Sequence, residues 1–230
     1  MRKRKFAAPR SELKELRFSA EAAYAESIFR SSIGDMNAAV EALERSVELD
    51  GTYSPAILSL GSVHYQRGDR AEGQRLFLSL LSVPDEAGEL EEIVDRAGDF
   101  LIEMGAYEDG LELYRAAVQR FPTSAVLHQG LGCCAGHQGL YDEAVRASER
   151  ALQLEPTKVA FVNDLGWALY EAGRLREAET MLERAVSMDD SYERARENLR
   201  MCRESIRKAS MESETANMAL KGTRRKRRAP

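Results

Sequence analysis

The sequence has little of several residue types that define particular classes of protein. Its three cysteines, Cys133, Cys134 and Cys202, are too few and too unevenly spaced for a disulfide framework or a four-ligand zinc site. No apolar run approaches the ~20 residues that cross a bilayer. The basic N-terminus lacks the apolar core of a secretory signal. We therefore expect an unprocessed intracellular protein with no membrane contact, cytoplasmic, or nuclear in a eukaryotic cell.

Motifs of catalytic and cofactor sites are also missing. The glycines do not form a phosphate-binding fingerprint, and no nucleophile stands in a pattern with a general base. His64 and His128 fall at helix-packing positions, and His137 is isolated from other metal ligands. The sequence predicts no enzyme, no bound metal and no cofactor.

Ala, Leu, Glu and Arg dominate the composition, which has only 6 prolines in 230 residues and favours an all-helical protein. Charge is unevenly distributed, with a net +5 over residues 1–19, −14 over 20–209 and +4 over 210–230. Because an acidic body repels nucleic acid, any contact with RNA or DNA is expected through the basic ends alone.

Glycines recur along the chain at a nearly constant spacing. Steps of 34, 37, 34 and 34 residues connect Gly34, Gly68, Gly105, Gly139 and Gly173. Each precedes a second helical run, as in "GRLREAETMLERAV". Glycine relieves the left-handed backbone that a helix C-terminus often needs, so each is predicted to mark the turn between two antiparallel helices.

Other positions keep the same phase. Small residues recur on both predicted helices of each unit, which lets the two backbones approach closely, at Gly61, Gly98, Gly132 and Gly166 on the first and at Ala39, Gly73, Gly110, Ala144 and Ala178 on the second. Apolar residues fill the remaining space: Leu60, Leu131 and Leu165 on the first helix, and Leu43, Phe77, Tyr114 and Leu182 on the second. Pro122 and Pro156 stop the second helix.

This 34-residue pattern closely resembles the tetratricopeptide repeat. The resemblance implies an all-α, right-handed superhelical solenoid of about five antiparallel helix–turn–helix repeats with a C-terminal capping helix. We place the repeats at 20–53, 54–87, 91–124, 125–158 and 159–192, after a basic N-terminal segment at 1–19. A capping helix is predicted at 193–209 and a disordered basic tail at 210–230. The first repeat departs most, since Glu26 and Ser27 replace the Leu-Gly pair.

In this family the first helix of each repeat lines a concave groove, so the resemblance implies a peptide-binding stripe on those helices. The predicted peptide-binding residues are Tyr24, Ile28, Leu58, Ser62, Tyr65, Glu92, Asp95, Asp99, Glu103, Gln129, Asn163, Trp167 and Tyr170, with Glu21, Cys133, His137 and Glu171 on the same stripe. Trp167, the only tryptophan, is either an anchor for a ligand or a packing residue against 193–209. Tyr24, Ile28 and Leu58 carry the same two interpretations.

Four carboxylates follow helical spacing in the third repeat, at Glu92, Asp95, Asp99 and Glu103. They form either an ordinary solvated face or a patch that selects a Lys/Arg-bearing peptide. The family's groove for C-terminal carboxylates uses Lys, Asn and Arg; of the corresponding residues only Arg96 is suitable, so that activity is not expected here.

The function predicted from these features is a non-enzymatic scaffold or adaptor that binds a protein or peptide segment in the groove. The alternative is a regulatory factor that contacts RNA or DNA through its basic tails. The tails have further interpretations as solubilising segments, as a nuclear address, or as ligands of the protein's own acidic groove. The sequence predicts no particular oligomeric state.

Overall fold

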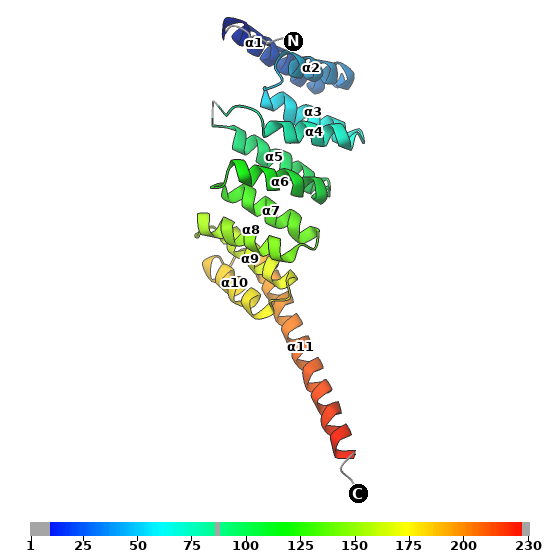
Figure 1. Cartoon of the computed structure of the whole chain (residues 1–230), viewed down its shortest axis with the longest axis vertical. Helices are drawn as coiled ribbons and strands as arrows, with labels where there is room; N and C mark the ends of the chain where they lie inside the picture. Colours follow the sequence, from blue (N-terminus) through cyan, green and yellow to red (C-terminus); the bar gives the residue numbers. More distant parts are fainter. Residues whose placement is uncertain (1–9, 86–87, 227–230) are drawn as a thin grey trace, which may run out of the picture. The chain divides into compact units, whose positions relative to one another are not determined.

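A computed structural model describes residues 10–85 and 88–226, with side chains from 11 to 212. This part of the chain contains eleven helices and no strand (Figure 1), which confirms the all-α helical repeat fold. The chain divides into two compact units, Met1–Pro122 and Thr123–Pro230. None of the described helices combines the length and the hydrophobicity needed to cross a bilayer.

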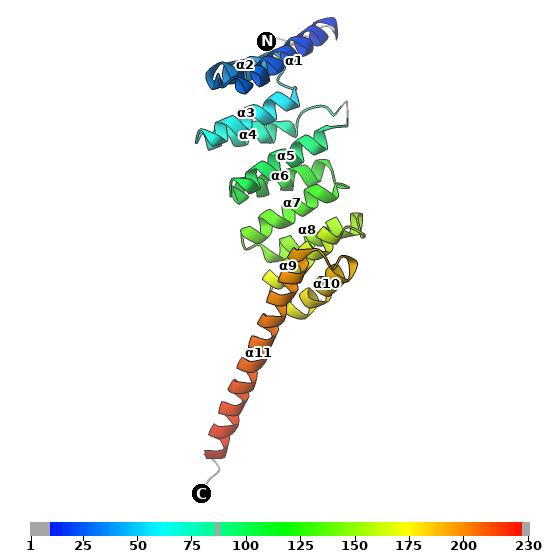
Figure 2. The same ribbon diagram turned by 180° about the vertical axis from the view of Figure 1, so that it is seen from behind.

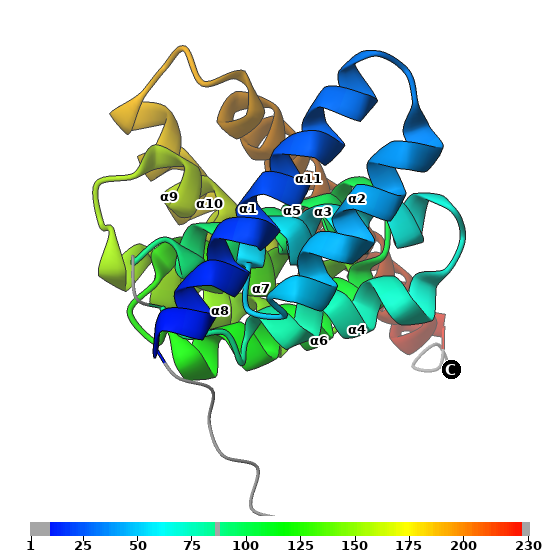
Figure 3. The same ribbon diagram turned by 90° about the horizontal axis from the view of Figure 1, so that it is seen from above.

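Unit 1 consists of three helix pairs. Their helices are α1 (Arg10–Ser32) with α2 (Met36–Leu49), α3 (Ser54–Gln66) with α4 (Arg70–Leu80), and α5 (Leu90–Glu103) with α6 (Tyr107–Arg120). Figure 3 shows α1 and α2 lying side by side, joined by a short turn. Each pair packs on the next through α2 against α3, and through α3 and α4 against α5.

Unit 2 contains two helix pairs and a long final helix. The pairs are α7 (Ala125–His137) with α8 (Tyr141–Leu154), and α9 (Val159–Glu171) with α10 (Leu175–Met188). The final helix, α11 (Glu193–Lys226), packs on α9 and α10 through the buried residues Ala195, Leu199, Cys202 and Ile206. Figure 2 shows α11 continuing well beyond the helices on which it packs.

Turn glycines separate the two helices of every pair. Gly34, Gly68, Gly105, Gly139 and Gly173 all have positive φ, between 68° and 88°, which confirms the predicted turns. Two of the second helices, α2 and α4, begin with an aspartate cap directly after the glycine. Asp69, for example, accepts a hydrogen bond at 3.4 Å from the backbone N–H of Glu72.

Close contact between paired helices depends on the first-helix glycines. A Cβ at Gly166 would stand 2.7 Å from Cγ of Leu182, and one at Gly61 would stand 2.6 Å from Cε1 of Phe77. Gly98 faces Tyr114 even more closely. In each case the facing side chain is sixteen residues later and fully buried. The predicted close approach is therefore confirmed, and the large side chain fills the space that the glycine leaves open.

Both ends of the helical region differ from the prediction. Helix α1 begins at Arg10, inside the predicted N-terminal segment, where Arg17 pairs with Asp50 at 2.7 Å and lies over the Tyr53 ring. The prediction of a disordered tail is wrong for residues 210–226, which continue α11. This stretch has no proline, and extending a helix that packing has already nucleated costs little. The basic residues at positions 2–5 and 227–228 lie outside the described residues.

Gly166→Ala tests the packing rule. The new methyl group collides with Leu182, so we expect the free energy of unfolding to fall by about 1–3 kcal/mol. The measurement is urea denaturation followed by circular dichroism. Gly132→Ala is the matched control, because it gains the same helix propensity but faces Ser148, which can rotate away. Equal losses for both variants would contradict the rule.

Candidate functional site

The α7/α8 pair breaks the packing rule of the other pairs. Ser148 stands sixteen residues after Gly132, where the other pairs have Leu43, Phe77, Tyr114 or Leu182. Beside this small side chain lies a pocket of about 350 Å³. Gly132 and Ser148 line it together with Ala168, so the pocket occupies space that a large side chain fills elsewhere.

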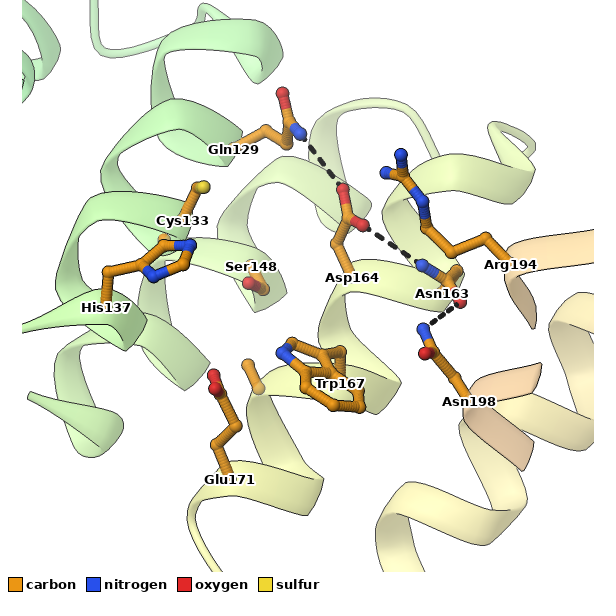
Figure 4. Close-up of a pocket in the computed structure, with 12 residues that line it drawn as sticks. Gln129, Cys133, His137, Ser148, Asn163, Asp164, Trp167, Glu171, Arg194 and Asn198 are labelled. Atoms are coloured by element: carbon orange, nitrogen blue, oxygen red, sulfur yellow. Dashed lines mark hydrogen bonds between the residues drawn. The ribbon is translucent and has the colours of Figure 1, made fainter. Parts of the chain in front are cut away.

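Polar side chains from α7, α9 and α11 surround the pocket (Figure 4). We call the first helix of each pair a first-position helix, and we include α11, which follows the last pair. They are Gln129, Cys133 and His137 on α7, Asn163, Asp164 and Glu171 on α9, and Arg194 and Asn198 on α11. The amide of Gln129 donates to Asp164 at 3.1 Å, and the amide of Asn163 donates to the other carboxylate oxygen at 3.2 Å. Asn198 donates in turn to Asn163 at 2.9 Å. This chain of hydrogen bonds ties the three helices together and orients Asp164.

The two carboxylates of the pocket are held in partly dehydrated surroundings. Burial raises the pKa of Asp164, although the Asn163 and Gln129 hydrogen bonds and the charges of Arg194 and Lys158 act in the opposite direction. Burial also raises the pKa of Glu171, against smaller opposing effects of His137 and of a hydrogen bond from Trp167. In both residues the surroundings disfavour the negative charge.

Trp167 forms a wall of the pocket, and in the sequence it lies between Asp164 and Glu171. Its ring lies 5.1 Å from that of Tyr170, centroid to centroid. The Tyr170 hydroxyl shares a hydrogen bond of 3.0 Å with Ser205 on α11. Tyr170 therefore braces Trp167 from the side of the terminal helix, and it does not itself line the pocket.

The predicted stripe is brought together well in unit 2. Gln129, Cys133, His137, Asn163, Trp167 and Glu171 all line the one pocket. Asn163 is only 1% exposed, so its contribution is to the hydrogen-bond chain.

The stripe is less coherent in unit 1. Leu58 and Tyr65 are each 8% exposed, and Tyr65 stacks on Phe77 and donates its hydroxyl hydrogen bond to Asp109. Leu58 and Tyr65, both predicted as binding residues, are therefore buried by packing within unit 1. Ser62 is half-buried and donates to the Leu58 carbonyl at 3.0 Å.

Tyr24 and Ile28 line a second pocket, of about 360 Å³, between α1, α2 and α3. Tyr24 shares a hydrogen bond of 3.4 Å with Ser59 and packs edge-on against Tyr53. Ile28 is 56% exposed, so it is the more accessible of the two. Tyr24 makes inter-helix contacts, whereas Ile28 presents an exposed apolar side chain, and a binding role for either residue stays a prediction.

The carboxylates of α5 lie in two environments. Glu92, Asp99 and Glu103 are exposed, whereas Asp95 is half-buried. The Tyr114 hydroxyl contacts both Asp95 and Asp99 at 3.4 Å. Glu92 and Glu103 are thus the most accessible charges of this stripe.

Sequence reasoning missed four polar residues of the pocket: Ser148, Asp164, Arg194 and Asn198. Ser148 was detectable as the one small residue in a column of large ones. Asn198 stands 34 residues after Asp164, so the repeat period leads to it only from a residue that the sequence had not selected. Asp164 lies one residue off the predicted stripe, and only the hydrogen bonds of Gln129 and Asn163 reveal its place.

No group of three or more His, Cys, Asp or Glu side chains within the described residues is arranged to hold a metal ion. Cys134 and Cys202 are buried, and Cys133 is half-buried at the pocket wall.

Antiparallel helix pairs, glycine turns at nearly constant spacing and packing of successive pairs within each unit define a helical repeat protein. Family models for the tetratricopeptide repeat match residues 20–53, 96–158 and 135–199. The chain belongs to the tetratricopeptide repeat family.

Solved structures of similar fold agree with this assignment. YrrB, described as a TPR protein with an unusual peptide-binding site, is 19% identical, with a TM-score of 0.55 over 80% of this chain and 94% of that one. MamA from Desulfovibrio magneticus RS-1 is 17% identical, with a TM-score of 0.54 over 76% and 97%. At these identities the likeness establishes the fold alone. A search of curated protein sequences found no match.

The raised pKa of Asp164 has a measurable consequence for stability. Its carboxyl is harder to ionise in the folded protein than in the unfolded chain, so its contribution is present at low pH and is lost as pH rises through the folded pKa. The wild type should therefore lose stability relative to Asp164→Asn as pH rises from the ordinary aspartate value of 3.8 towards neutrality. Urea denaturation of both proteins across this range measures the difference. A difference that is constant, or that favours the wild type as pH rises, would contradict the assignment.

Proposed function

We propose that this protein is a non-enzymatic interaction scaffold that binds a segment of another protein on its first-position helices. The observation that carries the proposal is the pocket of unit 2, to which α7, α9 and α11 each contribute side chains. Tetratricopeptide repeats characteristically serve as protein-interaction surfaces, and a pocket on the first helices suits an incoming side chain.

The chemistry of the pocket supports binding rather than catalysis. Amide groups, an indole and two carboxylates recognise polar and cationic groups by hydrogen bonding and charge. The printed description of YrrB as a peptide-binding TPR protein supports the same kind of function for this fold.

The exposed acidic residues of α5 favour a partner with basic residues. Glu92, Asp99 and Glu103 present negative charge on a first-position helix of unit 1. A Lys/Arg-bearing segment would be attracted to this face, and the attraction would act mainly on the rate of association. We accordingly propose a basic or amphipathic partner segment. In each unit taken by itself, the proposed binding residues are the accessible members of the predicted stripe, which excludes Leu58 and Tyr65.

Charge reversal on α5 tests this proposal. Glu92→Lys/Glu103→Lys should weaken capture of partner proteins from a lysate of the source cell by at least roughly tenfold, because repulsion replaces attraction. The matched control is Glu41→Lys/Glu44→Lys, which makes the same change on exposed positions of the second-position helix α2. Quantitative mass spectrometry of the captured proteins is the readout. Equal losses in both variants would attribute the effect to net charge and contradict the assigned face.

Nucleic-acid binding through the basic ends is a second candidate, favoured by the course of α11. Ile206 is the last buried residue in the part of α11 whose side chains are described, and Lys221 lies about 22 Å farther along the helix at 1.5 Å per residue. The helix therefore carries the backbone of the basic stretch from Lys221 to Lys226 away from the helix pairs of unit 2. It also opposes docking of this stretch into the pocket of its own unit, since Asn198 and Lys221 are about 35 Å apart along the same helix.

Deletion of residues 221–230 tests the second candidate. If these residues contact phosphates, binding to a fluorescent RNA or DNA oligonucleotide should be lost on deletion, and the full chain should show a steep fall in affinity with salt. Fluorescence anisotropy over a salt series measures both effects. Salt-insensitive binding, or binding that survives the deletion, would exclude this role for the tail.

A further inference from the structure

The pocket of unit 2 combines three features that no other helix pair shows together. A small side chain, Ser148, lines the pocket where the other described helix pairs carry a large one; an indole, Trp167, forms a wall; and two carboxylates, Asp164 and Glu171, stand on either side of that wall along α9. Asp164, Trp167 and Glu171 follow the i, i+3, i+7 spacing that places side chains on one helix face.

We propose that this pocket is a subsite for one basic side chain of the bound partner segment, arginine preferred. Its stem lies against Trp167 and the floor of Gly132, Ser148 and Ala168, and its cationic head lies at Glu171, with Asp164 as a second negative charge. The inference rests on the proposed function, because it names the chemistry that one part of the binding face selects.

The electrostatics favour a cation over an anion or a neutral group. Burial works against the negative charge of both Glu171 and Asp164, so a cationic group placed beside them offsets an existing cost. The face of an indole attracts a cation as well. Arginine suits the site better than lysine because its planar guanidinium stacks on aromatic rings and pairs with a carboxylate through two hydrogen bonds.

Arg194 sets the position of the head within the pocket. It is the lining side chain with a permanent positive charge, it is exposed, and its charge acts on Asp164. Figure 4 shows Arg194 and Glu171 on opposite sides of Trp167. A basic guest therefore avoids Arg194 and directs its head to Glu171.

The size of the pocket sets the size of the guest. At about 350 Å³ it is near the lower end of the range for small-ligand sites, which suits one side chain. Leu182 fills the corresponding space of the next helix pair, so Ser148→Leu should close the pocket with a side chain that the fold already accepts at that position.

The sole tryptophan allows a direct test, because its fluorescence reports on the pocket alone. The probes are two capped peptides, Ac-Ala-Ala-Arg-Ala-Ala-amide and its analogue with citrulline, which keeps the shape of arginine without the charge. The arginine peptide should give a saturable change in emission at concentrations up to about 10 mM, and the citrulline peptide should bind at least tenfold more weakly. Glu171→Gln should lower the affinity for the arginine peptide by roughly tenfold or more, and Asp142→Asn, on the exposed part of α8, is the matched control.

Equal binding of the two peptides, no saturable binding of either, or unchanged affinity in Glu171→Gln would overturn the proposal. Ser148→Leu provides an independent variant: it should abolish binding of the arginine peptide while circular dichroism and thermal unfolding remain those of a folded protein.

Partner capture with the same variant separates the subsite proposal from the proposed scaffold function. If Ser148→Leu still captures partners while the peptide results are negative, the subsite is wrong and the scaffold function stands. If arginine binds the pocket but no partner depends on the first-position helices, the scaffold function is wrong and the subsite stands.

Discussion

The distance between paired helices is the constraint on which this structure depends. Two antiparallel helices approach closely because the first carries a glycine, and a large side chain sixteen residues later fills the space beside it. Gly61 with Phe77, Gly98 with Tyr114, and Gly166 with Leu182 repeat this arrangement. The turn glycines then only have to reverse the chain, which their positive φ allows without strain. Within each unit, a helix pair buries its apolar side against the next pair. The same pairing of a small and a large residue therefore recurs as a regular array.

Ser148 is the exception to this array, because it is a small residue at a position where the other pairs carry a large one. Where the other pairs bury an aromatic ring or a leucine, the α7/α8 pair leaves space open to the first-position helices. Hydrogen bonds organise the side chains around that space: the amides of Gln129 and Asn163 donate to Asp164, and Asn198 of α11 donates in turn to Asn163. Tyr170 supports Trp167 through its contact with α11. The terminal helix thus has two roles, since it covers the apolar end of unit 2 and supplies Arg194 and Asn198 to the pocket wall.

Much of the fold could be predicted from the sequence because periodic signals are strong. The glycine spacing located the turns, and the residues that face the glycines were recognised as core. The stripe in unit 2 was also predictable, since the family resemblance identifies the groove helices and helical spacing then selects Gln129, Cys133, Asn163 and Trp167. Other features depend on tertiary contacts that no local pattern encodes. Leu58 and Tyr65 share the spacing of groove residues yet are buried by the neighbouring pair, and Asp164 joins the pocket through hydrogen bonds from another helix. The prediction of disorder failed for residues 210–226 because their polarity disfavours packing but does not prevent them from extending the helix that precedes them.

The central claim is that the first-position helices of unit 2 form a binding face centred on the Ser148 pocket. NMR chemical-shift mapping tests it most directly, by adding a captured partner segment to isotopically labelled protein. The account predicts that the largest shifts fall on the Trp167 indole N–H, the Gln129 side-chain amide and the backbone of α7 and α9, with small changes on α8 and α10. Shifts concentrated on α8 and α10, with the Trp167 indole unchanged, would contradict it.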